Sequence, residues 1–468
     1  IGILFALIIK CPGKKMKRIG GLFMSFWDVV LDFGLMSALI LAGQLLRAKV
    51  KFLQELFIPA SLLAGIIGLI CGPYGLGIIP FSEGFGSYSG ALIVMVFAAL
   101  PLSQEKSSGN KGGAGVMQMW GFQLITYLGQ HLWAMALGLL LFVPIFHAHA
   151  GFGYMLPTGF VGGHGTAAAV GETFKNLGWE EAEALGMTSA TVGILSGLIG
   201  GIILIKIATK KGYTNYITDF VKLPQSFRTG LIPKEEREEM GKETFSTISV
   251  DPLAIHAALL FVVTYVAKKI SELVLHFNPQ LSLPVFSLAV LVGFLLMKLL
   301  CLGGADKYVD KRVITRLSST FTDYLVGFGV ASIQLGVVVK YAVPLIILFV
   351  SGILFNLFIC MYLAPRVFSK DWFEKGIFTY GWASGVTAIG ITVLRICDPN
   401  FDSSTLDDFS ISYLFGNMWA ELIIVSVGPV MIASGMAVPY TAALAAVFTV
   451  VVLITWKMRR MQKGKAGL

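Results

Sequence analysis

The sequence predicts an all-α polytopic membrane protein built as two inverted five-span repeats, each with a re-entrant hairpin, plus one extra C-terminal span. Three observations predict this fold: a strongly apolar composition, long runs without charge, and an internal duplication. Of the 468 residues, 56 % are hydrophobic and 13 % are charged, and the mean hydropathy is +0.78. Since soluble domains carry about 25 % charged residues, the composition excludes a soluble enzyme, a disordered chain and a protein with a nucleic-acid partner.

Eleven runs are apolar enough to cross a bilayer, whose core takes about 20 helical residues. In chain order they cover residues 24–46, 56–79, 85–104, 116–146, 184–205, 251–275, 280–300, 317–339, 341–364, 409–434 and 438–456. The last of these is the extra span, because it follows the two sets of five.

Two further apolar stretches, 154–175 and 376–396, are too rich in Gly, Ala and Thr to face lipid as regular spans. Irregular backbone at membrane depth is tolerated only where protein or a water-filled cavity surrounds it. We therefore expect both stretches to form re-entrant hairpins.

The basic residues predict an orientation, because cytoplasmic loops are enriched in Lys and Arg. When the loops after spans 1, 3, 5, 7 and 9 and the C-terminal tail are placed inside, 26 of the 36 Lys and Arg lie inside and four lie outside. This predicts an outer N-terminus and an inner C-terminus. Residues 1–23 disagree, since an apolar run there precedes five basic residues, and we interpret them as a leader or upstream segment.

The two halves resemble each other. IPASLLAGIIG from Ile58 is similar to LPVFSLAVLVG from Leu283 at an offset of 225 residues, and GGHGTAAAV from Gly162 is similar to ASGVTAIGI from Ala383 at an offset of 221. Chance similarity between apolar segments is the alternative. Because each half holds five spans, the second half enters the membrane inverted, as in many secondary transporters. The predicted units are 24–208, a cytoplasmic linker at 209–250, 251–436, and 437–468 with the extra span and a basic tail.

The hairpins hold the candidate substrate site. Glycines leave backbone amides uncovered, and a broken helix presents a positive N-terminus to an anion. Unwound carbonyls and Thr hydroxyls suit Na⁺. The candidate substrate-binding residues are Gly162, Gly163, His164, Gly165, Thr166, Ser384, Gly385, Thr387 and Arg395. The alternatives are helix packing through small residues, a structural hydrogen bond for the histidine, and snorkelling for the arginine.

Acidic residues inside the predicted spans are costly and therefore point to function. Glu421 and Asp323 are candidates to bind Na⁺ or the ammonium group of a substrate. For Glu421 we favour Na⁺, because Thr387 and hairpin carbonyls could complete an oxygen shell; a packing hydrogen bond is the alternative. Asp28 and Asp32 are expected at the membrane interface, near the outer end of the first span.

GGHGTAAAV, followed by ATVGILSGLIGG from Ala190, resembles the bacterial sodium/glutamate symporter family, and the resemblance covers most of 24–436. It implies Na⁺-coupled uptake of L-glutamate across the bacterial cytoplasmic (inner) membrane, a homodimer surrounded by lipid, and elevator-like alternating access. Thr191, within the second motif, joins the two acids as a candidate ion ligand. The second hairpin matches the family pattern loosely, so another carboxylate such as aspartate or citrate is the alternative substrate.

The sequence gives no indication of an enzyme. It contains no HExxH, GxSxG or P-loop motif, and its five cysteines lack the spacing of a zinc site. We expect no catalytic residue, no cofactor and no metal other than the coupling Na⁺. A membrane-embedded enzyme and a channel are the competing classes. The missing motifs argue against the enzyme, and inverted hairpins with an intramembrane acid favour alternating access over a channel.

Overall fold

The computed structural model describes residues 25–55, 58–103, 113–216, 229–237, 239–277, 285–398 and 402–465. Within these ranges the chain is helical and has no β-strand, which confirms the all-helical prediction for the described part. The prediction of a leader at 1–23 lies outside the described residues, and so does part of the predicted linker.

Nine helical stretches of the described residues are long and apolar enough to cross a membrane. They are α2 (Phe26–Lys49), η1 with α5 (Phe85–Ser87 and Tyr88–Ser103), α6 with η2 and α7 (Ala114–Leu137, Gly138–Phe142 and Val143–Phe146), α10 (Ala182–Lys211), α12 (Pro252–Phe277), α13 (Val285–Leu302), α16 with η5 and α17 (Ala342–Phe358, Ile359–Leu363 and Ala364–Val367), α18 (Trp372–Cys397) and α21 (Ala437–Lys465). The chain is therefore a multi-pass membrane protein.

Two predicted spans have other bounds in the structure. The span predicted at 56–79 is the shorter helix α4 (Ala60–Cys71), because the chain turns after Gly72. The span predicted at 317–339 is instead α14 (Lys311–Ala331). This helix starts early because the Asp310 side chain accepts hydrogen bonds from the first backbone N–H groups, a standard N-cap.

Two further predicted elements differ in their continuity. The span predicted at 409–434 consists of α19 (Thr405–Ser412), the π-helical η6 (Tyr413–Asn417) and α20 (Met418–Ala433). The hairpin predicted at 376–396 lies within α18, which is long enough to count as a span but contains a break in its helical backbone.

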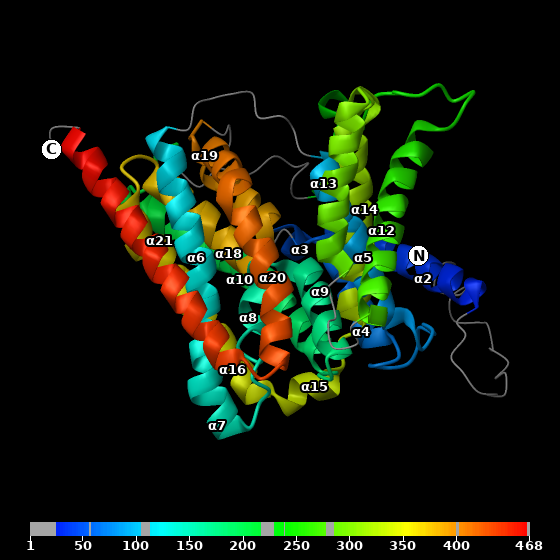
Figure 1. Ribbon diagram of the computed structural model, residues 1–468, viewed down its shortest axis with the longest axis horizontal. Helices are drawn as coiled ribbons and strands as arrows, with labels where there is room; N and C mark the ends of the chain where they lie inside the picture. The colour runs from blue at the N-terminus through cyan, green and yellow to red at the C-terminus, as the bar shows by residue number, and fades with distance from the viewer. Residues whose placement is uncertain are drawn as a thin grey trace.

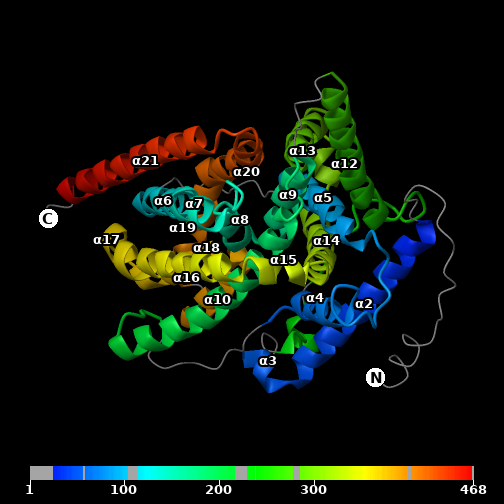
Figure 2. The same cartoon turned by 90° about the horizontal axis from the view of Figure 1, so that it is seen from below.

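The helices form two bodies that lie side by side in Figures 1 and 2. The span body contains α2, α4, α5, α12, α13 and α14, and the hairpin body contains α6, α7, α8 (Met155–Phe160), α10 and α16 to α21. α9 (Gly163–Asn176) completes the hairpin body: it packs on α8 and α10 within that body and on α5 and α14 of the span body. Shorter helical turns are α3 (Lys51–Glu55), η3 (Lys234–Glu236), η4 (Asp306–Tyr308) and α15 (Leu335–Lys340). Each body combines helices from both halves of the sequence.

The two halves share an irregularity at a fixed offset. The π-helical segments η2 and η5 begin at Gly138 and Ile359, 221 residues apart, and Pro144 and Pro365 follow them at the same offset. π-helical turns are rare, so a shared one is more specific than a shared apolar composition. This correspondence supports the predicted duplication.

Asp32, expected at the membrane interface near the outer end of the first span, is buried within the protein. Its side chain is 2 % exposed and accepts hydrogen bonds from the Ser82 backbone N–H at 2.9 Å, the Ser82 hydroxyl at 2.5 Å and the Tyr88 hydroxyl at 2.9 Å. A buried carboxylate is tolerated when several donors replace its water. Asp32 therefore ties α2 to the start of α5 inside the span body.

Candidate functional site

The first hairpin consists of α8 and α9, joined by a tight turn. Gly163, at the start of α9, has a φ of +66°. Glycine adopts this left-handed conformation readily because it has no Cβ. The chain then returns, since the ring of Phe174 near the end of α9 lies 6.2 Å from the ring of Tyr154, which precedes α8. The stretch 154–175 therefore folds back on itself.

The second hairpin is formed by the two halves of α18. The break lies at Gly385 (φ −148°, ψ 38°) and Val386 (φ 66°, ψ 170°). The halves fold back on each other, because a Cβ on Gly390 would lie 2.8 Å from the carbonyl oxygen of Phe378. The backbone conformation of Val386 is almost confined to glycine, so the surrounding packing holds a strained residue at this tip.

One face of α10 packs against both hairpins. Near its start, Glu183 lies against Gly171 of the first hairpin, and beyond its midpoint, Gly200 lies against Tyr380 of the second. Small residues permit such close helix contacts, which accounts for the Gly-rich sequence of α10. The two hairpins therefore approach from opposite ends of α10.

The tips of the hairpins meet. A Cβ on Gly163 would overlap Cγ1 of Val386, and a Cβ on Gly193, midway along α10, would overlap the carbonyl oxygen of Ser384. Glycine at 163 leaves room for the Val386 side chain, and glycine at 193 lets α10 approach the backbone of the second tip directly. The meeting point combines the two segments that the sequence pairs at an offset of 221.

Two buried amides hold the tip of the second hairpin. The Gln130 amide donates to the Ala383 carbonyl at 3.0 Å and to Oδ1 of Asn356 at 3.0 Å. The Asn356 amide donates to the Ala383 carbonyl at 3.2 Å and to the Ser384 hydroxyl at 2.9 Å. Both amides are fully buried, so these hydrogen bonds are expensive to lose.

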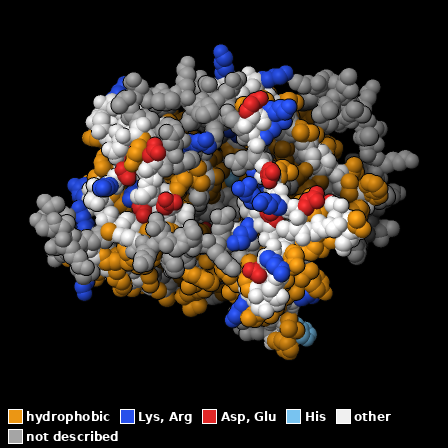
Figure 3. Space-filling model, turned by 90° about the horizontal axis from the view of Figure 1, so that it is seen from above, with side chains coloured by type: hydrophobic (Ala, Val, Ile, Leu, Met, Phe, Trp, Pro, Cys, Tyr) orange, Lys and Arg blue, Asp and Glu red, His pale blue; other side chains and the backbone are white. Residues whose placement is uncertain are grey.

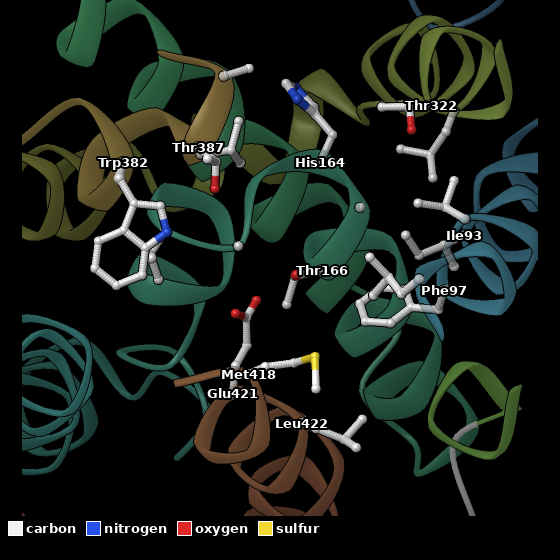
Figure 4. A pocket seen from close by; sticks show the side chains of 18 of the residues that line it. Ile93, Phe97, His164, Thr166, Thr322, Trp382, Thr387, Met418, Glu421 and Leu422 are labelled. Atoms are coloured by element: carbon white, nitrogen blue, oxygen red, sulfur yellow. The ribbon is translucent and has the colours of Figure 1, made fainter. Parts of the chain in front are cut away.

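A cavity of about 400 Å³ lies where the hairpin tips face the span body. Small-molecule sites commonly measure about 300–1,000 Å³. Figure 4 shows the cavity with its lining side chains. The hairpins contribute Val161, Gly162, His164, Gly165, Thr166, Trp382, Val386, Thr387 and Ala388; the span body contributes Ile93, Val96, Phe97, Leu100, Val290, Thr322, Leu325 and Val326; Ile194, Tyr413, Met418, Glu421 and Leu422 complete the wall. Both bodies and both tips therefore enclose one space.

Glu421 carries the one formal charge among the described residues that line the cavity. Its Oε2 accepts a hydrogen bond from the Tyr413 hydroxyl at 2.8 Å. In Figure 4 its carboxylate points into the space toward which Thr166 and Thr387 also point. Three oxygen-bearing side chains, one from each hairpin and one from α20, therefore converge.

The lining that the structure describes contains no Lys or Arg. Positive potential comes instead from helix N-termini, since the first N–H groups of a helix have no intrahelical acceptor. One helix begins at Gly163, with no side-chain cap at Gly162, and another segment begins after Val386. Both starts belong to the cavity wall, which therefore offers two places for an anionic group.

The structure brings six of the predicted site residues to the cavity: Gly162, His164, Gly165, Thr166, Thr387 and Glu421. His164 is 3.1 Å from the Thr191 hydroxyl, measured from Nε2, and that hydroxyl donates to the Met187 carbonyl. The imidazole is therefore the donor to Thr191. In Figure 4 the His164 ring points away from Glu421.

Other predicted residues lie outside the lining. Ser384 and Gly385 are buried behind the second tip, and Arg395 lies further along α18. Asp323 is exposed and lies beside α4, although Thr322, the residue before it, lines the cavity. The structure therefore separates Asp323 and Arg395 from the convergent oxygens.

Sequence reasoning missed four residues of this region: Tyr413, Trp382, Gln130 and Asn356. The two amides carried a usable signal, because isolated polar side chains in apolar spans mark functional or structural contacts. The sequence signal for Tyr413 was weaker: it lies eight residues before Glu421 in the same predicted span.

Spanning helices with paired broken segments that meet at a central site are typical of secondary transporters. The sequence pattern of the sodium/glutamate symporter family matches residues 27–392. The chain belongs to this family, which confirms the resemblance and makes it a membrane transporter, a class distinct from enzymes. No curated protein matches the chain. The matched range ends within α18, so α19, α20 with Glu421, and α21 follow it.

Proposed function

We propose that the chain takes up L-glutamate together with Na⁺ by alternating access, with the hairpin body moving against the span body. The observation that carries the proposal is that one cavity is lined by both hairpin tips and by both bodies. Movement between the bodies changes the access to such a cavity without separating the tips. The family match supplies the substrate and the ion and does not favour aspartate or citrate.

The substrate carboxylates bind at the two helix N-termini, one in each hairpin, with the hydroxyls of Thr166 and Thr387 as further donors. This arrangement accommodates a dicarboxylate although the described lining has no Lys or Arg. Ser384 and Gly385 act by shaping the second tip. Direct roles for Arg395 and for the other candidate residues outside the lining stay predictions.

Glu421 binds the cation that accompanies the substrate. Its carboxylate, the Tyr413 hydroxyl and the two hairpin threonines form an oxygen-rich region of the cavity wall. We favour Na⁺ over the substrate ammonium group because hard oxygen ligands from side chains and unwound backbone suit this ion. Thr191 and Asp323 stay candidate Na⁺ ligands by prediction alone.

A polar contact joins the two bodies on one side of the cavity. The Ser89 hydroxyl of α5 donates to Glu183 of α10 at 2.7 Å, and Glu172 of α9 lies against Gly90. Relative movement has to break this contact. A disulfide between Ser89→Cys and Glu183→Cys, in a background without the native cysteines, should stop uptake, and reduction should restore it. Full uptake by the cross-linked protein contradicts the moving-body mechanism.

The transport function is tested with purified protein in proteoliposomes. An inward Na⁺ gradient should drive accumulation of labelled glutamate, and replacement of Na⁺ by choline should abolish it. Excess unlabelled aspartate or citrate should compete less well than unlabelled glutamate. Equal uptake in choline with a proton gradient excludes Na⁺ coupling, and stronger competition by citrate excludes glutamate as the preferred substrate.

Glu421→Gln separates the two cation roles. If Glu421 binds Na⁺, the Na⁺ concentration for half-maximal uptake should rise about tenfold or more, while glutamate dependence at saturating Na⁺ changes little. If it binds the ammonium group, the glutamate dependence shifts instead. Tyr413→Phe is the matched control, because it removes the hydrogen bond and keeps the charge. Unchanged dependence on both solutes in Glu421→Gln leaves Glu421 with a structural role.

The expected setting is the bacterial cytoplasmic membrane, with an outer N-terminus, an inner C-terminus and a homodimeric assembly. Figure 3 supports a charged aqueous face at one end, where Lys and Arg side chains lie among Asp and Glu side chains and apolar side chains follow part of the rim. The basic loops of the sequence belong to the cytoplasm in this proposal. Accessibility of single cysteines to a membrane-impermeant reagent tests the orientation.

A further inference from the structure

A second, separate groove lies between the start of α6, the end of α17 and the C-terminal part of α21, and it has a volume of about 280 Å³. The helices touch at the level of the groove, because a Cβ on Gly121 of α6 would overlap the side chain of Thr455 of α21, which itself lines the groove. Figure 1 shows α6 and α21 farther apart toward the C-terminus than at their other ends. The groove therefore lies between two spanning helices, near the start of α6 and the end of α21.

The groove combines an apolar wall with two cationic side chains. Ile125, Leu363 and Val452 contribute hydrocarbon surface, and Arg366 and Arg459 both line the groove. No Asp or Glu is among the described residues that line it. This composition differs from that of the central cavity, where the one formal charge is negative.

Arg366 is held in a defined geometry. Its Nη1 donates to the Tyr362 carbonyl at 2.6 Å, and its guanidinium lies 3.5 Å from the centroid of the Tyr362 ring. A guanidinium that is stacked and anchored in this way is suited to bidentate binding of a phosphate. The groove therefore presents at least one orientated donor for an anionic head group.

We propose that this groove binds an anionic phospholipid, with the phosphate at Arg366 and Arg459 and an acyl chain along the apolar wall. Basic pockets between spanning helices on the cytoplasmic side are suited to such head groups. A free phosphate leaves the apolar wall uncovered. A second copy of the chain is disfavoured as the occupant of the groove, because the last turns of α21 are basic and those of two copies repel each other. The helix α21, which forms the third wall of the groove, comes after residue 392 in the sequence, where the match to the family pattern ends.

The test compares lipid binding to the purified full chain by native mass spectrometry. Phosphatidylglycerol should bind at least tenfold more tightly than phosphatidylcholine. Arg366→Gln with Arg459→Gln should weaken phosphatidylglycerol binding about thirtyfold, since each basic residue contributes near an anionic lipid surface. The matched control is Lys370→Gln with Lys457→Gln, which removes the same charge from exposed neighbours outside the groove and should keep binding within twofold.

Val452→Trp provides a charge-neutral second test, because it fills the apolar wall and should also weaken phosphatidylglycerol. Thermal unfolding in phosphatidylcholine confirms that each variant is folded. Equal binding of the two lipids, or retention of phosphatidylglycerol by the double arginine variant, overturns the proposal. Displacement of the lipid by millimolar inorganic phosphate assigns a free-anion site instead, and a dimer that the arginine variant dissociates assigns the groove to a second copy. Glutamate uptake is not part of the readout, so the result is independent of the proposed transport function.

Discussion

The two hairpins are alike in outline but are stabilised differently. At the tip of the first, Gly163 adopts a left-handed φ without strain, whereas at the tip of the second Val386 adopts one with strain. Beside the first, the ion pair of Glu181 with Lys340 is largely exposed on the lysine side, at 59 %. At the base of the second, the ion pair of Lys375 with Asp408 is buried, with side-chain exposures of 4 % and 10 %.

The difference indicates how each hairpin keeps its shape. The first has a sequence that fits its turn and needs little external support. The turn of the second hairpin requires a strained backbone conformation at Val386. Buried amides hold this hairpin at its tip, and a buried ion pair holds it at its base. We therefore expect the second hairpin to respond more strongly to the loss of its neighbours, and the first to changes in its own glycines.

The largest effect is expected from Gly163→Val. A branched side chain overlaps Val386 of the opposite tip and is strained at a φ of +66°, so glutamate uptake should fall to background. Surface expression should stay close to wild type, because the change is confined to the tip contact. Gly34→Ala is the control, since a Cβ there meets no atom within 4 Å. Uptake near the wild-type rate in Gly163→Val means that the tip contact is dispensable.

Asp408→Asn is expected to destabilise the second hairpin by about 3–5 kcal/mol, because it leaves the Lys375 ammonium buried without its counter-charge. Thermal unfolding of the purified protein measures the loss. Lys375→Met combined with Asp408→Leu should recover much of it, since no unpaired charge remains. A double variant that is less stable than Asp408→Asn contradicts this account of the ion pair.

Val386→Gly should stabilise the protein by about 1 kcal/mol. Release of the strained backbone outweighs the greater chain entropy of glycine in the unfolded state. The midpoint of thermal unfolding should rise by roughly 1–3 °C. Val386→Ala keeps the strain and is the matched control. A lower midpoint for the glycine variant than for the alanine variant shows that the Val386 side-chain contacts dominate.

The smallest effect is expected from Glu181→Gln, because exposed ion pairs contribute about 0–1 kcal/mol. Burial opposes ionisation of Glu181, but hydrogen bonds from Lys340 and Tyr341 outweigh it and lower its pKa below the ordinary value of 4.5. The contribution is therefore present above pH 4.5 and is lost as the pH falls through the lowered pKa. Unfolding midpoints of wild type and variant should differ slightly at pH 7 and converge toward pH 3. A constant difference across that range assigns the effect to packing.

The sequence was sufficient for features that depend on local composition. Charge-free runs give most of the spans. The Gly- and Thr-rich stretches indicate the two segments whose backbone folds back, with Thr166 and Thr387 in the cavity lining, while their re-entrant placement in the membrane stays a prediction. The bounds of α14 were missed, because the Asp310 cap and the polar first turns extend this helix beyond its apolar run. Boundaries set by a single cap are weakly encoded in hydropathy.

Two kinds of feature could not be predicted: the direction in which a side chain points from its helix, and contacts between residues that are far apart in the sequence. Asp323 and Thr322 are neighbours in sequence, yet one residue of helix turns a side chain through about 100°, and only Thr322 faces the cavity. Gln130 and Asn356 are 226 residues apart and meet only in three dimensions. The sequence identifies such residues as unusual but does not identify their partners.

The shared face of α10 has a consequence for how the protein is made. Gly200 emerges 180 residues before Tyr380, its neighbour in the second hairpin. At about 5–20 residues per second, synthesis of the intervening chain takes roughly 10–40 s. Throughout that interval the later half of this face lacks its native cover, while the first hairpin, encoded just upstream, is already available to the earlier half. Insertion therefore proceeds with a half-covered helix, whose glycines remain against lipid or the insertion machinery until the second hairpin arrives.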